Sequence, residues 1–172
     1  MKKIFYLILF LLIFNKAYSH NLENSTDNCK TINFDLESQE FFIDLEGFSA
    51  KPVKKESITF LGNIVIEKRT YKNSNSKFKV SLYRGKDLIN NWKFLLFSLS
   101  GFSEESLKDL EIENFKAKLY EKENYKAVIF PLLESENMVL VIIFSSETLT
   151  LEEMIDLIKK FPIQKFCLAS CS

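Results

Sequence analysis

The feature that most constrains the fold is an unbroken apolar run over residues 138–144, Met-Val-Leu-Val-Ile-Ile-Phe. Successive side chains of a strand point to opposite faces, so a strand that is apolar throughout must be covered on both sides. The run has the length of a strand and is far shorter than the roughly 20 residues that a membrane-spanning helix needs. We therefore predict a central, covered strand at 138–144.

Other segments show the alternation of a strand with one exposed face. In residues 77–83, Phe78, Val80 and Leu82 alternate with polar residues, and residues 115–119 follow the same pattern. We predict further strands at 58–72, where Gly62 marks a bulge or turn, and at 127–133, where Pro131 indicates an edge or a bend. Hairpin turns are expected at 73–76, 121–124 and 134–137.

Three segments have the 3.6-residue apolar period of a helix: 34–45, 87–99 and 150–161. Asp35 and Asp87 are candidate N-caps, Gly47 and Pro162 are stop signals, and Thr150-Leu-Glu-Glu forms a capping box. Residues 49–56 and 100–113 are then connections. The element order α-β-β-α-β-β-β-α predicts an α+β fold, an antiparallel sheet of about five to six strands with helices packed mainly on one face.

The chain begins like an exported protein. Two lysines precede an apolar run at 4–14, and Ala17-Tyr18-Ser19 supplies small residues at the −3 and −1 positions of a cleavage site before His20. An uncleaved anchor is the alternative, but the run is short and Lys16 follows it closely. We expect a signal peptide at 1–19, a flexible segment at 20–33, one domain at 34–166 and a cysteine-containing tail at 167–172.

The charge balance argues against polyanionic partners. The chain carries 23 basic and 23 acidic residues, and three of the lysines lie in the leader, so the mature chain has 20 against 23 and a net charge of −3. Such a surface gives no general electrostatic reason to bind nucleic acid or anionic lipid. We expect a periplasmic or secreted protein that does not insert stably into a membrane after cleavage.

The layout is similar to that of small exported bacterial proteins of the PsbP/Mog1-like α+β class, many of which have no known function. The residues that carry this resemblance are Leu-Glu-Gly-Phe at 45–48, Glu-Lys-Arg-Thr-Tyr-Lys at 67–72, Phe-Lys-Ala-Lys-Leu at 115–119 and Leu-Glu-Glu-Met-Ile at 151–155. The resemblance covers roughly residues 34 to 161 and rests on element order and hydrophobic spacing. It implies an architecture and no catalytic residues, because fold alone does not define function.

Three cysteines, Cys29, Cys167 and Cys171, are disulfide candidates in an oxidising compartment. A bridge from Cys29 to either of the other two would join the ends of the domain, and the third cysteine would remain over. The alternative is a thiol-redox or copper-handling site that uses the C-terminal Cys-x-x-x-Cys and His20, the only histidine. A copper site needs more ligands than these residues supply, so we expect no metal and no cofactor.

No catalytic constellation accompanies these residues. A single histidine and the absence of a Gly-x-Ser-x-Gly motif argue against triad chemistry. The paired acids Glu104–Glu105, Glu111/Glu113 and Glu121/Glu123 fall in expected connections and solvated faces. We therefore do not expect an enzyme.

A basic hairpin remains, formed by Lys68, Arg69, Lys72, Lys77 and Lys79 with Tyr71 and Phe78 interleaved. Its candidate partner-binding residues are Lys68, Arg69, Tyr71, Lys77 and Lys79. Such a hairpin can bind an anionic partner, but lysines on an exposed strand also protect a sheet edge from aggregation. The sequence thus favours an exported, non-enzymatic binding or assembly accessory protein of the cell envelope that contacts another protein, with the thiol or copper function as the alternative.

Overall fold

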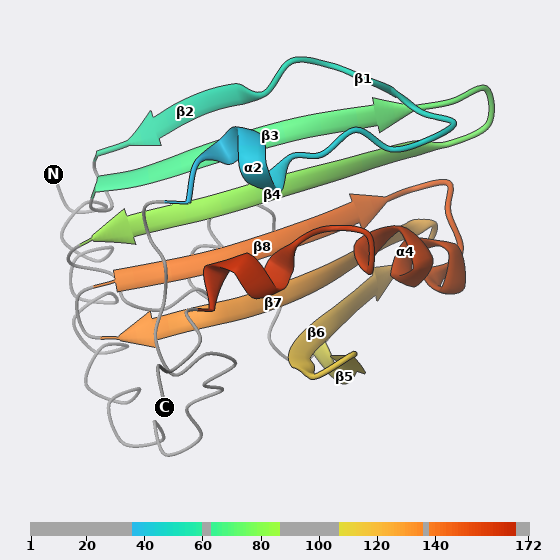
Figure 1. Cartoon of the computed structure of the whole chain (residues 1–172). Coiled ribbons are helices and arrows are strands. Elements are labelled where there is room, and N and C mark those ends of the chain that lie inside the picture. Colours follow the sequence, from blue (N-terminus) through green and yellow to red (C-terminus); the bar gives the residue numbers. More distant parts are fainter. Residues whose placement is uncertain (1–35, 60–62, 87–106, 136–137, 168–172) are drawn as a thin grey trace, which may run out of the picture.

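A computed structural model describes residues 36–59, 63–86, 107–135 and 138–167, and its centre is one eight-stranded antiparallel sheet (Figure 1). The strand order is β1-β3-β4-β8-β7-β6-β5, and β2 also pairs with β3. The strands are β1 (Ser49–Ala50), β2 (Lys54–Ile58), β3 (Asn63–Lys72), β4 (Lys77–Lys86), β5 (Leu107–Ile112), β6 (Phe115–Lys122), β7 (Tyr125–Ser135) and β8 (Met138–Ser146).

The predicted central strand is confirmed. β8 lies between β4 and β7, and its residues 140–144 are buried, so both of its faces are covered. Val80 of β4 lies opposite Phe144, and Val128 of β7 lies opposite the same residue from the other side. The apolar run therefore sits where burial on both faces stabilises it most.

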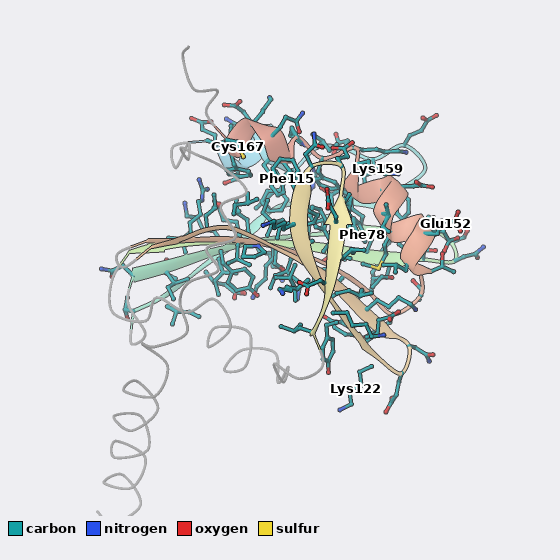
Figure 2. All side chains as sticks on the ribbon, turned by 90° about the horizontal axis from the view of Figure 1, so that it is seen from below. Phe78, Phe115, Lys122, Glu152, Lys159 and Cys167 are labelled. Carbon is teal, nitrogen blue, oxygen red and sulfur yellow. The ribbon has the colours of Figure 1, made fainter. Side chains whose placement is uncertain are left out.

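One side of the sheet, which we call the phenylalanine face, carries Phe78, Phe130 and Phe144. Three short helical segments add their apolar side chains to this face: α2 (Ser38–Phe41), α4 (Leu151–Ile158) and the 3₁₀ helix η2 (Ile163–Phe166). Phe41 of α2 lies 5.2 Å from Phe166 and 5.6 Å from Phe161, measured between ring centroids. Figure 2 shows α4, with Glu152 and Lys159, on the same side of the sheet as Cys167.

The other side, which we call the lysine face because Lys68, Lys72, Lys77 and Lys79 lie on it, has a second apolar cluster. Its buried members come from five strands and are Ile64, Ile66, Tyr83, Tyr120, Ala127, Ile129, Val141 and Ile143. The two clusters follow directly from the alternation of side chains along β3, β4, β7 and β8.

The predicted α+β class is wrong, because the described chain is predominantly an antiparallel β-sheet. The helix expected at 34–45 is the single turn α2, whose N-cap Glu37 makes no side-chain cap hydrogen bond. Residues 107–112, expected to be part of a connection, form β5, and 49–56 contains β1 and the start of β2. The helix expected at 87–99 lies outside the described residues, as do Gly62 and residues 1–35.

Tertiary contacts explain why α2 ends so early. The carbonyl oxygens of Phe42 and Ile43 accept hydrogen bonds from Arg69, and that of Ile43 also accepts one from Tyr71. Contacts to the sheet therefore take the place of a further helical turn. The apolar residues of the expected stripe, Phe41, Phe42 and Leu45, are nevertheless buried.

One local prediction is confirmed and another is corrected. Thr150 and Glu153 form the predicted reciprocal capping box at the start of α4. Gly47 does not end the predicted helix, because α2 already ends at Phe41, but its φ of 80° is the left-handed conformation that glycine adopts without strain. Pro131 does not mark an edge, because β7 lies between β6 and β8, but a register shift follows it. Across the described part of the chain, no helix is long and apolar enough to span a bilayer.

Candidate functional site

The five candidate partner-binding residues of the predicted basic hairpin do not share one surface. Tyr71 belongs to the core of the phenylalanine face, so Arg69, two positions before it in β3, lies on that side as well. Lys68 lies on the opposite face. In β4, Lys77 and Lys79 alternate with the buried Phe78 and therefore also lie on the lysine face.

Arg69 holds the segment that leads into β1 and β2. Its guanidinium donates to the carbonyl oxygens of Phe42, Ile43 at 3.1 Å and Lys51 at 3.2 Å, and pairs with Asp44 at 2.5 Å. It also lies over the Tyr71 ring, with its central carbon 5.3 Å from the ring centroid. All three guanidinium nitrogens of Arg69 therefore bind groups of the same chain.

Tyr71 also fastens the segment that precedes β1 to the sheet. Its ring is completely buried, and its hydroxyl donates to the Ile43 carbonyl oxygen at 2.9 Å. Burial raises the pKa of Tyr71 to about 12, although the neighbouring Arg69 acts in the opposite direction. We therefore assign Arg69 and Tyr71 to the fold, where they fasten residues 42–51 to the sheet.

A second buried polar group was not anticipated from the sequence. Glu67 of β3 is only 2% exposed, and its carboxylate accepts a hydrogen bond from the Ser38 hydroxyl and pairs with Arg84 of β4. Arg84 also donates to the Leu36 carbonyl oxygen at 2.7 Å, and Lys55 approaches Glu67 at 3.6 Å. Burial acts to raise the pKa of Glu67, but the hydrogen bonds from Ser38 and Arg84 outweigh it and lower that pKa below 4.5.

The alternation of side chains along the strands indicates this ion pair. Glu67 lies on the same face of β3 as Tyr71, and Arg84 lies on the same face of β4 as Phe78, Val80 and Leu82. An acid and a base on the apolar sides of two neighbouring strands predict a buried ion pair once the strand pairing is known.

Five lysines gather on the lysine face at the end of the β3–β4 hairpin. Lys54 of β2 is directly opposite Lys68 of β3, and Lys72 of β3 is directly opposite Lys77 of β4. Lys79 lies opposite Thr70, midway between these two pairs along the strands. With a rise of about 3.3 Å per residue, the lysines cover about 13 Å along the strands.

We call Lys54, Lys68, Lys72, Lys77 and Lys79 the lysine surface, and acidic side chains neutralise only part of its charge. Lys68 pairs with Glu56 at 2.7 Å, and this hydrogen bond, together with the charge of Lys68, lowers the pKa of the exposed Glu56. Among the described residues, the other members of the surface, Lys54, Lys72, Lys77 and Lys79, form no ion pair. Partial burial lowers the pKa of Lys79, and the charges of Lys68 and Lys77 lower it further.

Tyrosines and serines border the lysine surface toward β7 and β8. Tyr83 forms a hydrogen bond with Ser81, and burial raises its pKa to about 12. Tyr125 forms a hydrogen bond with Ser145, which lies directly opposite Lys79, and burial raises the pKa of Tyr125 as well. The lysines are therefore the exposed, charged end of a face that becomes apolar toward Ile129 and Val141.

The sheet order decides between the two interpretations of these lysines. β3 lies between β1 or β2 and β4, and β4 lies between β3 and β8, so neither is an edge strand. Lys68, Lys72, Lys77 and Lys79 cannot protect an edge from positions on interior strands. Only Lys54, on β2, fits that explanation.

The remaining candidates lie largely beyond the described residues. Cys167, directly after η2, is disulfide-bonded. His20, Cys29 and Cys171 fall outside the described ranges, so the pairing of the cysteines and the copper alternative stay predictions. No group of three or more potential metal ligands occurs within the residues that the structure describes.

The acidic pairs are surface residues where the structure describes them. Glu111, Glu113, Glu121 and Glu123 are all exposed, and Glu121 pairs with Lys108 at 3.3 Å. Glu113 and Glu123 occupy the β5–β6 and β6–β7 turns. Glu104 and Glu105 lie outside the described residues.

Comparison with known proteins found no matching protein-family model, no matching curated protein and no matching solved structure. The resemblance to the PsbP/Mog1-like class therefore stays a prediction. Function has to be inferred from the residues of the site itself.

Proposed function

We propose that this protein is a non-enzymatic binding or assembly accessory protein of the cell envelope, and that it contacts a protein partner through its lysine surface. The leader-like residues 1–19 support export to the periplasm or beyond. The arrangement of lysines on interior strands supports binding.

The single observation that carries the proposal is the direct opposition of Lys72 and Lys77 across β3 and β4. Like charges at directly opposed positions destabilise a sheet, and Lys54 opposite Lys68 repeats the arrangement. Like charges that are kept at opposed positions, with no acidic side chain of the same protein to balance them, are typical of functional surfaces. A negatively charged partner would reduce the repulsion between Lys72 and Lys77.

The non-enzymatic part of the proposal rests on how the polar groups are used. Arg69 and Tyr71 fasten the segment before β2, Glu67 and Arg84 are paired with each other, and the described acidic pairs are exposed. These groups have structural or surface roles, and the Ser38 hydroxyl that donates to the buried Glu67 carboxylate belongs to the same structural network.

A photo-cross-linking experiment tests the proposal in the cells that produce the protein. A photoreactive amino acid replaces Thr70, which lies among the lysines without removing any of them, or Lys160, which is exposed beyond α4 on the other side. We expect a discrete cross-linked protein from position 70 and none of the same size from position 160. Equal products from both positions, or no product from position 70, would contradict the proposal.

A further inference from the structure

We infer that the lysine surface recognises an extended acidic segment of a partner protein in which carboxylate side chains recur at every second residue. This inference rests on the proposed function and specifies the partner's chemistry. It follows from the spacing of the lysines along the strands, from their exposure and from the charge of the rest of the molecule.

The lysines occupy three successive levels along the strands. Lys68 and Lys54 define the first level, Lys79 lies two residues further toward the hairpin turn, and the pair Lys72 and Lys77 lies two residues beyond that. Successive levels are about 6.6 Å apart, because a strand rises about 3.3 Å per residue. This is also the distance between side chains on the same side of an extended peptide.

An extended peptide that lies along β3 and β4 would therefore meet one level of lysines with each alternate side chain. Three carboxylates at positions i, i+2 and i+4 would span about 13 Å and match the three levels. In a helix, neighbours on one side are about 5–6 Å apart and recur at three or four residues, so their carboxylates would fall out of step with the levels. The spacing of the lysines thus favours a partner segment in the extended conformation.

The exposure of the lysines is suited to such contacts. Lys54, Lys72, Lys77 and Lys79 are exposed, and Lys68 is one quarter exposed while it pairs with Glu56. Ammonium groups bind carboxylates as point charges, without the fixed bidentate geometry of a guanidinium. Complementary charges of this kind contribute chiefly to specificity and to the rate of association.

The rest of the molecule disfavours a broad anionic surface as the ligand. The chain has equal numbers of basic and acidic residues, and the lysine surface itself contains Glu56. α4 presents Glu152, Glu153 and Asp156 on the opposite side of the sheet. A compact basic patch on a chain without net positive charge fits a localised acidic segment better than an extended anionic membrane.

Synthetic peptides test this inference directly. The first alternates glutamate and serine, and the second has the same composition with its glutamates grouped at one end. Both are titrated against the mature protein, and vesicles of phosphatidylcholine with phosphatidylglycerol provide a membrane probe. We expect the alternating peptide to bind most tightly, with an affinity that falls as salt rises, and the vesicles not to bind.

Two variants with the same change in charge provide the control. The triple variant K72E/K77E/K79E should lose the alternating peptide by about tenfold or more, whereas K159E/K160E/K165E, on the other side of the sheet, should retain it. Equal binding of the alternating and grouped peptides, vesicle binding in place of peptide binding, or equal affinity of the two variants would overturn the inference. If position 70 still cross-links a partner while the peptides fail, the proposed function survives and only the partner's conformation is wrong.

Discussion

Glu67 and Arg84 form an ion pair on the phenylalanine face, the side of the sheet opposite the lysines, and the Glu67 side chain is 2% exposed. The pair joins neighbouring interior strands, and through Ser38 and the Leu36 carbonyl oxygen it also fixes the start of the described chain. The polar groups of β3 are thereby divided between its two faces. Those on the phenylalanine face hold the fold, and those on the lysine face are partly exposed (Lys68 and Thr70) or exposed (Lys72).

Glu67→Gln should destabilise the protein. The substitution keeps the shape of the side chain but removes the negative charge of Glu67, which is 2% exposed and paired with Arg84. Removal of one member of a buried ion pair costs about 3–5 kcal/mol. Urea unfolding of the variant and the parent protein measures the loss. The control is Asp109→Asn, which removes an exposed carboxylate paired with Lys118 and should cost less than about 1 kcal/mol. A loss of the same small size for both variants would show that the buried pair does not fasten the strands.

The same carboxylate makes stability depend on pH. Because the pKa of Glu67 is lowered in the folded state, its stabilising contribution is present above about pH 4.5 and is lost as the pH falls through the folded pKa. We expect the free energy of unfolding to decline more steeply between about pH 5 and pH 3 in the parent protein than in Glu67→Gln. Parallel declines would mean that Glu67 titrates alike in the folded and unfolded states.

Phe41→Ala should be among the most damaging core substitutions. Phe41 is fully buried, and its ring contacts those of Phe42, Phe161 and Phe166, so it joins α2 to the C-terminal end of the chain. Truncation of a buried phenylalanine costs about 3–5 kcal/mol. Gln39→Ala, on the exposed side of α2, is the matched control and should change the free energy of unfolding by less than about 0.5 kcal/mol. Thermal or urea unfolding would contradict this role if the two variants behaved alike.

Glu113→Gly and Glu123→Gly should each stabilise the protein or leave it unchanged. The two glutamates have φ values of 56° and 54°, a left-handed conformation that costs a residue with a Cβ roughly 1–2 kcal/mol. The greater freedom of glycine in the unfolded chain offsets part of the gain, which leaves up to about 1 kcal/mol. Glu111→Gly, within β5, provides the contrast and should destabilise. Loss of stability in both turn variants would contradict the assigned conformation.

The cysteines can be assigned by mass. We expect Cys167 to be protected from alkylation in protein purified from its producing cells, because it is disulfide-bonded, and one of the other two cysteines to be modified. A cross-linked peptide that contains Cys29 and Cys167 would establish the bridge between the two ends of the domain, and an intact mass that begins at His20 would establish the cleavage. Free thiol at Cys167 together with an intact Met1 would contradict export.

Several elements could be predicted from the sequence because their signals are local, whereas β1 and β5 lie in segments that were expected to be connections. The run at 138–144, the alternation at 77–83 and the capping box at Thr150 all coincide with β8, β4 and α4. The α+β class was wrong because apolar residues at helical spacing in 34–45 meet sheet residues that compete for their backbone. Arg69 and Tyr71, which lie 26 and 28 residues after Ile43, bind the Ile43 carbonyl oxygen that a longer helix would have used.

The lysine surface could be predicted only in part. Lys68, Lys72, Lys77 and Lys79 belong to the basic hairpin predicted from the sequence, but Lys54 joins them only through the pairing of β2 with β3. That pairing depends on the whole sheet. The same sheet order excludes edge protection for four of the five lysines, a conclusion that no single segment contains.

The most direct test of the central claim combines the photoreactive residue at position 70 with the two charge-reversal variants. If the lysine surface binds an acidic protein partner, the cross-linked product persists in K159E/K160E/K165E and disappears in K72E/K77E/K79E, while both variants unfold at similar denaturant concentrations. A product of equal yield in the two variants would contradict the claim, because recognition would then not depend on the lysines.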